Sequence, residues 1–303
     1  MVQGLHHLTA LAGDPQQNLD FYTGKLGLRL IKTTVNFDDP SVYHLYFGDG
    51  AGTPGTVITS FPYGRALPGT RGAGEASAVT LLVPEGTLDR WATRLPEATE
   101  ATSFGKRQLR LLDPDGMEIR LEEAPERIRV EWPGMPIPPE EAIIRMGTIE
   151  LTPARARAVG RYADTGALLE RLGASESARE GNIVRYALGD AFVDVVEDAS
   201  LPPLRQSAGS VHHIAFRLAG DAEQAEAMQA LHAEGVATTP VRDRDYFHSI
   251  YFREPGCVLY ELATETPGFA TDETFETLGS ALRLPAQHEP RRAAIEAHLP
   301  PLQ

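Results

Sequence analysis

Residues 211–216 read VHHIAF, and 206 positions earlier residues 5–10 read LHHLTA. Each stretch has the alternating pattern of a β-strand and begins with a pair of histidines. A third stretch, PGCVLYEL at 255–262, predicts a turn followed by a strand that carries one carboxylate, Glu261. Two neutral imidazoles and one carboxylate on adjacent strands form the facial ligand set that suits non-haem Fe(II). The three stretches therefore predict a metal site assembled from both ends of the chain.

The layout around the first stretch recurs along the chain. A β-type stretch, a helical stretch and further short strands follow one another four times, and the copies open at residues 5–11, 76–84, 146–153 and 211–216. The predicted helices cover 15–26, 87–95, 155–172 and 221–234, and Asp14 fits an N-cap for the first of them. Aligning the strand starts places His7, Ala78, Gly147 and His213 in register, at separations of 71, 69 and 66 residues. We therefore predict an α+β protein of four βαβββ modules.

Composition shifts suggest where these modules separate. Residues 132–139 read WPGMPIPP, a proline density that suits an extended linker. We predict an N-terminal pair of modules at 1–124, a proline-rich linker at 125–141, a C-terminal pair at 142–265 and a C-terminal tail at 266–303, with a helix at 290–298.

Composition also excludes several classes of partner and site. The chain has 303 residues, 42% of them hydrophobic, and a net charge of −14, which argues against nucleic acid or an anionic membrane as a partner. The N-terminus shows no secretory leader pattern, and no apolar run reaches the length of about 18 residues that a membrane span needs. We expect a cytoplasmic protein. With Cys257 as the single cysteine, an intrachain disulfide and cysteine-based metal sites are excluded, and any metal must be held by His, Asp or Glu.

The repeat also predicts how many sites the chain carries. Modules two and three have Ala78 and Gly147 where modules one and four have histidine, so a single site is expected. Aligning the Pro-Gly pairs at 54–55 and 255–256 places Ser60 in the position of Glu261. Three strong ligands and one vacancy favour an oxygenase, because four protein ligands would nearly close the metal and favour Lewis-acid isomerisation.

Longer motifs connect the chain to a known family. They are LHHLT at 5–9, VYHLYF at 42–47, GTPGTV at 52–57, VHHIAF at 211–216 and RDYFHSIYFR at 244–253. With these motifs and its four modules the chain resembles the vicinal oxygen chelate (glyoxalase/bleomycin-resistance/extradiol dioxygenase) superfamily, and within it the bacterial hydroquinone and chlorohydroquinone ring-cleaving dioxygenases. The resemblance implies two incomplete-barrel, cup-shaped mixed sheets. It also implies an extradiol-type dioxygenase that uses Fe²⁺, rather than Mn²⁺, to insert both atoms of O₂ into a small aromatic substrate.

The resemblance further implies a role for individual residues. The metal ligands would be His7, His213 and Glu261. The residues that handle substrate and oxygen would be His6, Thr9, His212, Arg244 and Tyr251. Thr9 shares strand parity with His7 and faces the same side, whereas His6 and His212 would need a bulge or strong twist to turn them toward the site. Because the two distant modules must share one ion, we predict that modules one and four pair across the molecule.

Two alternatives remain open. One is a glyoxalase-type isomerase or lyase that uses Zn, Ni or Mn, and the other is a metal-free protein of the same fold that binds an aromatic compound or drug. The preferred substituents of the substrate, the cleavage of catechols, homo-oligomer formation and the role of the tail are also left open. We interpret His44 as structural and Cys257 as a small buried hydrophobe.

Overall fold

The computed structural model describes residues 2–303 and contains four βαβββ modules, as predicted. The first module comprises β1 (Leu5–Ala12), α1 (Pro15–Asp20), the π-helix η1 (Phe21–Lys25), β2 (Arg29–Val35), β3 (Tyr43–Gly48) and β4 (Val57–Pro62). The second comprises β5 (Glu75–Pro84), α2 (Leu88–Arg94), β6 (Thr99–Ser103), β7 (Lys106–Leu112) and β8 (Glu118–Ala124). The third comprises β9 (Arg145–Thr152), α3 (Thr165–Arg171), β10 (Ser175–Glu180), β11 (Ile183–Leu188) and β12 (Ala191–Val196). The fourth comprises β13 (Val211–Leu218), α4 (Asp221–Ala233), β14 (Arg242–Asp243), β15 (Phe247–Arg253) and β16 (Leu259–Pro267).

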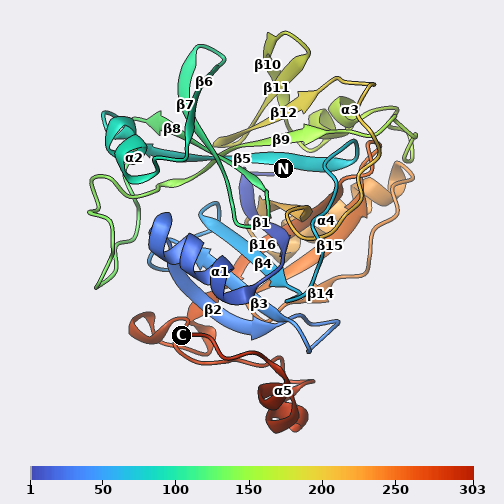
Figure 1. The fold of residues 1–303 in the computed structure, drawn as a ribbon. Coiled ribbons are helices and arrows are strands. Elements are labelled where there is room, and N and C mark those ends of the chain that lie inside the picture. Colours follow the sequence, from blue (N-terminus) through green and yellow to red (C-terminus); the bar gives the residue numbers. More distant parts are fainter. Residues whose placement is uncertain (1) are drawn as a thin grey trace.

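The strands form two curled, open mixed sheets of eight strands each, as expected. The first has the order β14-β15-β16-β13-β1-β4-β3-β2, and the second has the order β10-β11-β12-β9-β5-β8-β7-β6. Module one therefore joins module four, and module two joins module three, which confirms the predicted pairing across the molecule. In Figure 1 the blue and orange strands of the first sheet lie together below the green and yellow strands of the second. The domain boundaries after residues 124, 141 and 265 stay a prediction.

The centre of the first sheet is the antiparallel pair β1 and β13, and this pair is irregular at two places. Its register passes from Leu5 opposite Phe216 to His7 opposite Ala215, which leaves His6 as an extra residue on β1. It shifts again next to His212, this time with the extra residue on β13. Each bulge thus lies immediately before a predicted ligand, where it can turn the extra side chain out of the regular alternation of the strand.

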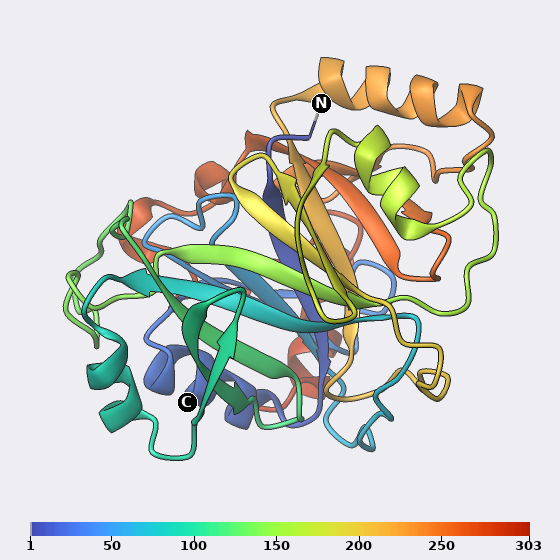
Figure 2. The same ribbon diagram turned by 90° about the horizontal axis from the view of Figure 1, so that it is seen from above.

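The helices follow local sequence signals to different degrees. The predicted N-cap is confirmed, since the Asp14 carboxylate accepts hydrogen bonds from the backbone N–H groups of Gln16 and Gln17, both at 2.9 Å. The prediction of a helix over 155–172 is wrong for its first half, because α3 begins only at Thr165. Asp164 caps α3 by accepting a hydrogen bond from the N–H of Ala167 at 2.8 Å, and this fixes its start. Figure 2 shows α3 beside the long α4, and the guanidinium of Arg171 pairs with Glu234 at the end of α4.

The tail packs against module one. The side chain of Lys32 on β2 is fully buried and pairs with Asp272 at 2.6 Å and with Glu273 at 2.5 Å. Further along, Leu282 forms a β-bridge with Thr33. The predicted terminal helix is present as α5 (Arg292–His298), preceded by the short 3₁₀ turns η2 (Phe269–Thr271), η3 (Phe275–Thr277) and η4 (Glu289–Arg291). No helix within residues 2–303 combines the length and the apolar character that crossing a membrane would require.

Candidate metal centre

Three side chains from the predicted ligand set converge in the cup of the first sheet. The Nε2 atoms of His7 and His213 lie 3.2 Å apart. The Oε2 atom of Glu261 lies 2.9 Å from His213 Nε2 and 3.3 Å from His7 Nε2. All three residues are buried, and within the described part of the chain they form a group of donors that could hold a metal ion.

The spacing and chemistry of these atoms fit a metal ion. Ligands about 2.1 Å from an ion and at right angles to one another would lie about 3.0 Å apart, close to the three distances observed. Among the residues that the structure describes, Oε2 of Glu261 is buried without a hydrogen-bond partner, which is the expected state of an atom meant for a cation. Burial opposes the charged form of Glu261, but His7 and His213 more than offset it and hold its pKa well below the usual range.

His6 determines which nitrogen of His7 is free. Its Nε2 lies 3.0 Å from the carbonyl oxygen of Thr264, which can only accept, so this nitrogen carries the proton of a neutral ring. Burial, followed by the neighbouring His7, lowers the pKa of His6 to about 3, so the ring is neutral. The Nδ1 of His6 therefore accepts the Nδ1 proton of His7 across 2.9 Å. The remaining nitrogen of His7, Nε2, keeps its lone pair for a metal.

His212 stands in the same relation to His213. The Nδ1 atoms of these two rings lie 2.7 Å apart, and burial lowers the pKa of His212 to about 3. The bulges thus place His6 and His212 beside the ligands, as their expected roles required. They differ in exposure to the site, because His212 lines the adjacent cavity and His6 is not among its lining residues.

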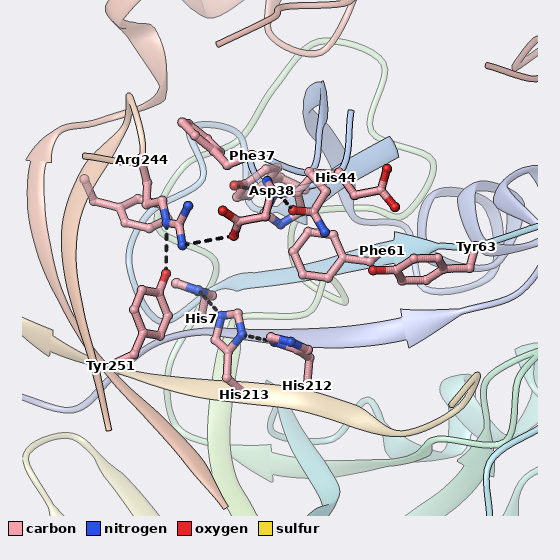
Figure 3. A pocket seen from close by; sticks show the side chains of 14 residues that line it. His7, Phe37, Asp38, His44, Phe61, Tyr63, His212, His213, Arg244 and Tyr251 are labelled. Carbon is pink, nitrogen blue, oxygen red and sulfur yellow. Dashed lines mark hydrogen bonds and ion pairs between the residues drawn. The ribbon is translucent and has the colours of Figure 1, made fainter. Parts of the chain in front are cut away.

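A cavity of about 290 Å³ opens beside the two ligand histidines (Figure 3). Its lining residues are His7, Asn36, Phe37, Asp38, Asp39, His44, Tyr46, Phe61, Tyr63, His212, His213, Arg244, Phe247 and Tyr251. The mixture of aromatic faces and a few polar groups suits a small aromatic ligand.

Arg244 and Tyr251 form one polar wall of this cavity. The Nε of Arg244 donates a hydrogen bond to the Tyr251 hydroxyl at 3.2 Å, and its guanidinium lies 3.9 Å from Asp38 (Figure 3). Burial works against the Arg244 cation, but Tyr251 and Glu261 outweigh it, so the pKa of Arg244 is raised. Burial, followed by the charge of Glu261, raises the pKa of Tyr251, which keeps the phenol protonated at neutral pH. Thr9 lies at the opposite side of the ligand set, with its hydroxyl 2.9 Å from His213 Nε2.

Comparisons with known proteins agree with this geometry. The model of the Glyoxalase/Bleomycin resistance protein/Dioxygenase superfamily matches residues 4–121. MhqO of Bacillus subtilis (strain 168), provisionally named a ring-cleaving dioxygenase, is 41% identical over 99% of this chain and 96% of its own. The chain belongs to this superfamily.

Two further similarities place the chain within the superfamily. The chlorohydroquinone/hydroquinone 1,2-dioxygenase of Sphingobium indicum is 36% identical over 95% of this chain and 93% of its own. A crystal structure of a Bacillus subtilis protein, provisionally named a dioxygenase, superimposes with a TM-score of 0.93 and 41% identity, covering 100% of this chain and 98% of that one. As predicted, this superfamily member resembles the bacterial hydroquinone ring-cleaving dioxygenases.

The two halves of the first cup correspond residue by residue. On β1, Thr9 lies beside Thr59 of β4, and on β13, Ala215 lies beside Glu261 of β16. Thr9 and Ala215 each follow a ligand histidine by two residues, so Thr59 occupies the position equivalent to Glu261. The prediction that Ser60 fills this position is wrong. The conclusion drawn from it survives, because a threonine hydroxyl is also a weak metal ligand compared with a carboxylate.

The error arose in the turn that precedes the last strand of module four. Cys257 lies there with a left-handed backbone (φ 74°), so this turn contains one residue more than its counterpart in module one. The hydroxyl of Ser60 points away from the cup and donates a hydrogen bond to Asn18 on α1 at 2.6 Å. Cys257 itself is exposed, which contradicts its interpretation as a buried hydrophobe.

The second cup has the same architecture and different chemistry. Thr80 of β5 lies opposite Thr148 of β9, as Thr9 lies opposite His213 in the first cup. Thr148 is therefore the counterpart of His213, and the predicted register with Gly147 is wrong because Gly147 is the extra residue of a bulge.

A carboxylate does survive in the second cup. Asp194 lies beside Glu150, as Glu261 lies beside Ala215, and is therefore the counterpart of Glu261. It is buried and accepts two hydrogen bonds of 2.7 Å from Arg185. A guanidinium thus neutralises the carboxylate that faces a metal in the first cup.

Sequence reasoning missed part of the site. His44 was interpreted as structural, and Tyr46 and Thr59 were not considered. His44 and Tyr46 share strand parity in VYHLYF, and Tyr46 lies opposite Thr59 as Tyr251 lies opposite Glu261. Aligning the third strands of modules one and four would have identified Tyr46 from Tyr251.

Proposed function

We propose that this superfamily member is a ring-cleaving dioxygenase that acts on hydroquinone-type aromatics with O₂ and uses Fe(II), with Mn(II) as the less suitable metal. The observation that carries the proposal is the set of two imidazoles and one carboxylate whose fourth corner is occupied by threonine hydroxyls. A site of this kind keeps coordination positions for exogenous ligands, as oxygenation requires and a four-ligand isomerase site does not. The names of MhqO and of the Sphingobium enzyme support the same reaction class.

Fe(II) held by His7, His213 and Glu261 would supply the redox chemistry that couples an aromatic donor to dioxygen. The protein's own contribution is to position the ring and manage protons. The aromatic faces of Phe61 and Phe247 line the cavity in which the substrate ring would lie. The cation of Arg244 would stabilise an oxygen of the ring that gains negative charge.

Proton transfer falls to groups that contact the cavity. Tyr251 is kept protonated by its raised pKa and can donate to substrate. His212 is neutral because of its lowered pKa and can accept a proton from a phenol hydroxyl that enters the cavity. A para-diol has no two adjacent hydroxyls, so the term extradiol applies only by analogy. We propose cleavage between a hydroxyl-bearing carbon and its neighbour, in keeping with the 1,2 of the Sphingobium enzyme's name.

Oxygen uptake tests this proposal. Protein reconstituted anaerobically with Fe(II) is mixed with O₂ and unsubstituted, methyl- or chloro-hydroquinone, with catechol and the methylglyoxal–thiol adduct as comparisons. We expect one O₂ consumed per hydroquinone, and a loss of at least about 100-fold in Glu261→Ala and His213→Ala. The matched control is His232→Ala, which changes an exposed histidine on α4. Metal-loaded protein that isomerises the adduct and consumes no oxygen with any diol would contradict the proposal.

A further inference from the structure

Four polar side chains lead from the interior of module one to the ligand set. The hydroxyl of Tyr46 lies 2.9 Å from His44 Nδ1, and His44 Nε2 lies 2.9 Å from the hydroxyl of Thr59. The Thr59 hydroxyl lies 2.7 Å from that of Thr9, which lies 2.9 Å from His213 Nε2. Every contact is thus within hydrogen-bonding distance, and the chain runs from Tyr46 to the edge of the metal centre.

The far end of this chain has one way to satisfy its proton. The Tyr46 side chain is 1% exposed, and within residues 2–303 its hydroxyl makes one hydrogen bond, the contact with His44. A buried hydroxyl proton without an acceptor is costly, so Tyr46 must donate and His44 Nδ1 must accept.

The direction then passes along the chain. Burial, followed by the neighbouring His7 and His213, lowers the pKa of His44 well below its usual value, so the ring carries one proton. With Nδ1 accepting, that proton lies on Nε2 and is donated to Thr59. Thr59 must then donate to Thr9, whose own proton is left for an acceptor at the metal centre.

We propose that Tyr46, His44 and Thr59 are positioning residues that fix Thr9 as a hydrogen-bond donor to an oxygen atom of the substrate at the fourth corner of the ligand set. Thr9 is then the catalytic residue of the group, because it alone would touch the reacting molecule. The identity of the accepting oxygen rests on the proposed function, whereas the direction of the chain does not.

The symmetry of the cup locates this donor. On the module-four side, Ser249 donates a hydrogen bond to Glu261, in the position that His44 holds relative to Thr59. One half of the cup therefore ends in a carboxylate that binds the metal directly, and the other half ends in a hydroxyl that donates a proton. An oxygen atom opposite Glu261 would meet a donor there and no competing protein ligand.

The direction of the chain can be tested without metal or substrate. In ¹⁵N-histidine-labelled protein, NMR should show His44 protonated at Nε2, with its signal assigned by its loss in His44→Gln. Tyr46→Phe removes the donor to Nδ1 and should move the proton to Nδ1. The matched control is Tyr43→Phe, which lies on the same strand and removes a tyrosine hydroxyl that donates to the carbonyl of Pro300 at 2.9 Å. His44 protonated at Nδ1 in the unaltered protein would overturn the proposal, whatever the activity.

A second measurement tests whether the chain acts through Thr9. Hydroquinone is titrated anaerobically into the Fe(II)-loaded protein, where no turnover occurs, and the bound metal is quantified in each variant. We expect Tyr46→Phe and Thr9→Val each to weaken hydroquinone binding about tenfold with full metal content, and the double variant to match Thr9→Val within about twofold. Additive losses would show that Tyr46 acts on the substrate by itself and would contradict the proposal. Failure of the proposed function would instead appear as no oxygen uptake with any diol.

Discussion

The imidazole pairs on β1 and β13 explain why each predicted ligand is preceded by a second histidine. His6 is not a ligand and does not line the cavity, yet it selects the tautomer of His7 through the carbonyl of Thr264. Its position next to a ligand could be predicted from LHHLTA, because the same pair recurs in VHHIAF. Its function could not, because it depends on a bulge that the alternation of apolar residues does not reveal.

A buried carboxyl outside the site gives the fold a distinct pH dependence. Oδ1 of Asp113 accepts hydrogen bonds from the N–H groups of Asp115 and Met117, and Oδ2 accepts one from the Tyr22 hydroxyl at 3.2 Å. Burial raises the pKa of Asp113 to about 6, above its unfolded value of about 3.9. The folded state therefore binds this proton more tightly, and the stabilisation is complete below about pH 4 and lost as the pH rises through about 6.

We therefore predict that Asp113→Asn is more stable than the unaltered protein by roughly 2 kcal/mol at pH 7, because it keeps an acceptor oxygen without a buried charge. The advantage should vanish near pH 4. Urea unfolding of both proteins at pH 4, 5.5 and 7 measures it. A difference that is constant across this range would contradict the raised pKa of Asp113.

At the scale of elements, sequence patterns predicted strands and caps better than turns. The N-cap at Asp14 and the terminal helix at 290–298 follow from local signals. The turn around Cys257 does not, because one additional residue in a left-handed conformation shifts every later position by one without changing the apolar pattern. That single residue is why Thr59 was overlooked in favour of Ser60.

The contact between the tail and β2 depends on one buried cation. Lys32→Met would leave the fully buried carboxylate of Glu273 without its partner. We predict a loss of about 3 kcal/mol in the free energy of unfolding, and faster proteolysis within 266–303 than in the body of the protein. The double variant Lys32→Met/Glu273→Gln should recover part of the loss.

The control for this prediction is an ion pair of similar length on the surface. Lys25 lies 2.5 Å from Glu97, and both side chains are exposed. Lys25→Met should cost less than about 1 kcal/mol. Equal losses in Lys32→Met and Lys25→Met, measured by guanidinium unfolding, would show that burial of Lys32 does not matter.

At the scale of the whole molecule, the repeat explains both the symmetry and the single site. The recurrence of His pairs in modules one and four predicted which cup would be chemically competent. It could not reveal that Asp194 remains in the second cup, because the partner that neutralises it, Arg185, lies on a different strand.

We therefore predict one equivalent of bound metal per chain. Metal-free protein titrated with Fe(II) under anaerobic conditions, or with Mn(II) as a spectroscopic substitute, should saturate at one ion, and Glu261→Ala should abolish tight binding. Asp194→Ala should leave the stoichiometry of a folded protein unchanged. A second equivalent that disappears in Asp194→Ala would show that the second cup also binds metal.

The pairing of β1 with β13 has a consequence for the chain during its synthesis. A ribosome releases His7 first and the strands that carry His213 and Glu261 more than 200 residues later. Until β16 has emerged, a nascent or prematurely terminated chain holds one of the three donors and cannot capture a redox-active ion. The protein thus gains the ability to bind iron only when its last module is complete, and fragments that the cell must degrade carry no centre able to react with oxygen.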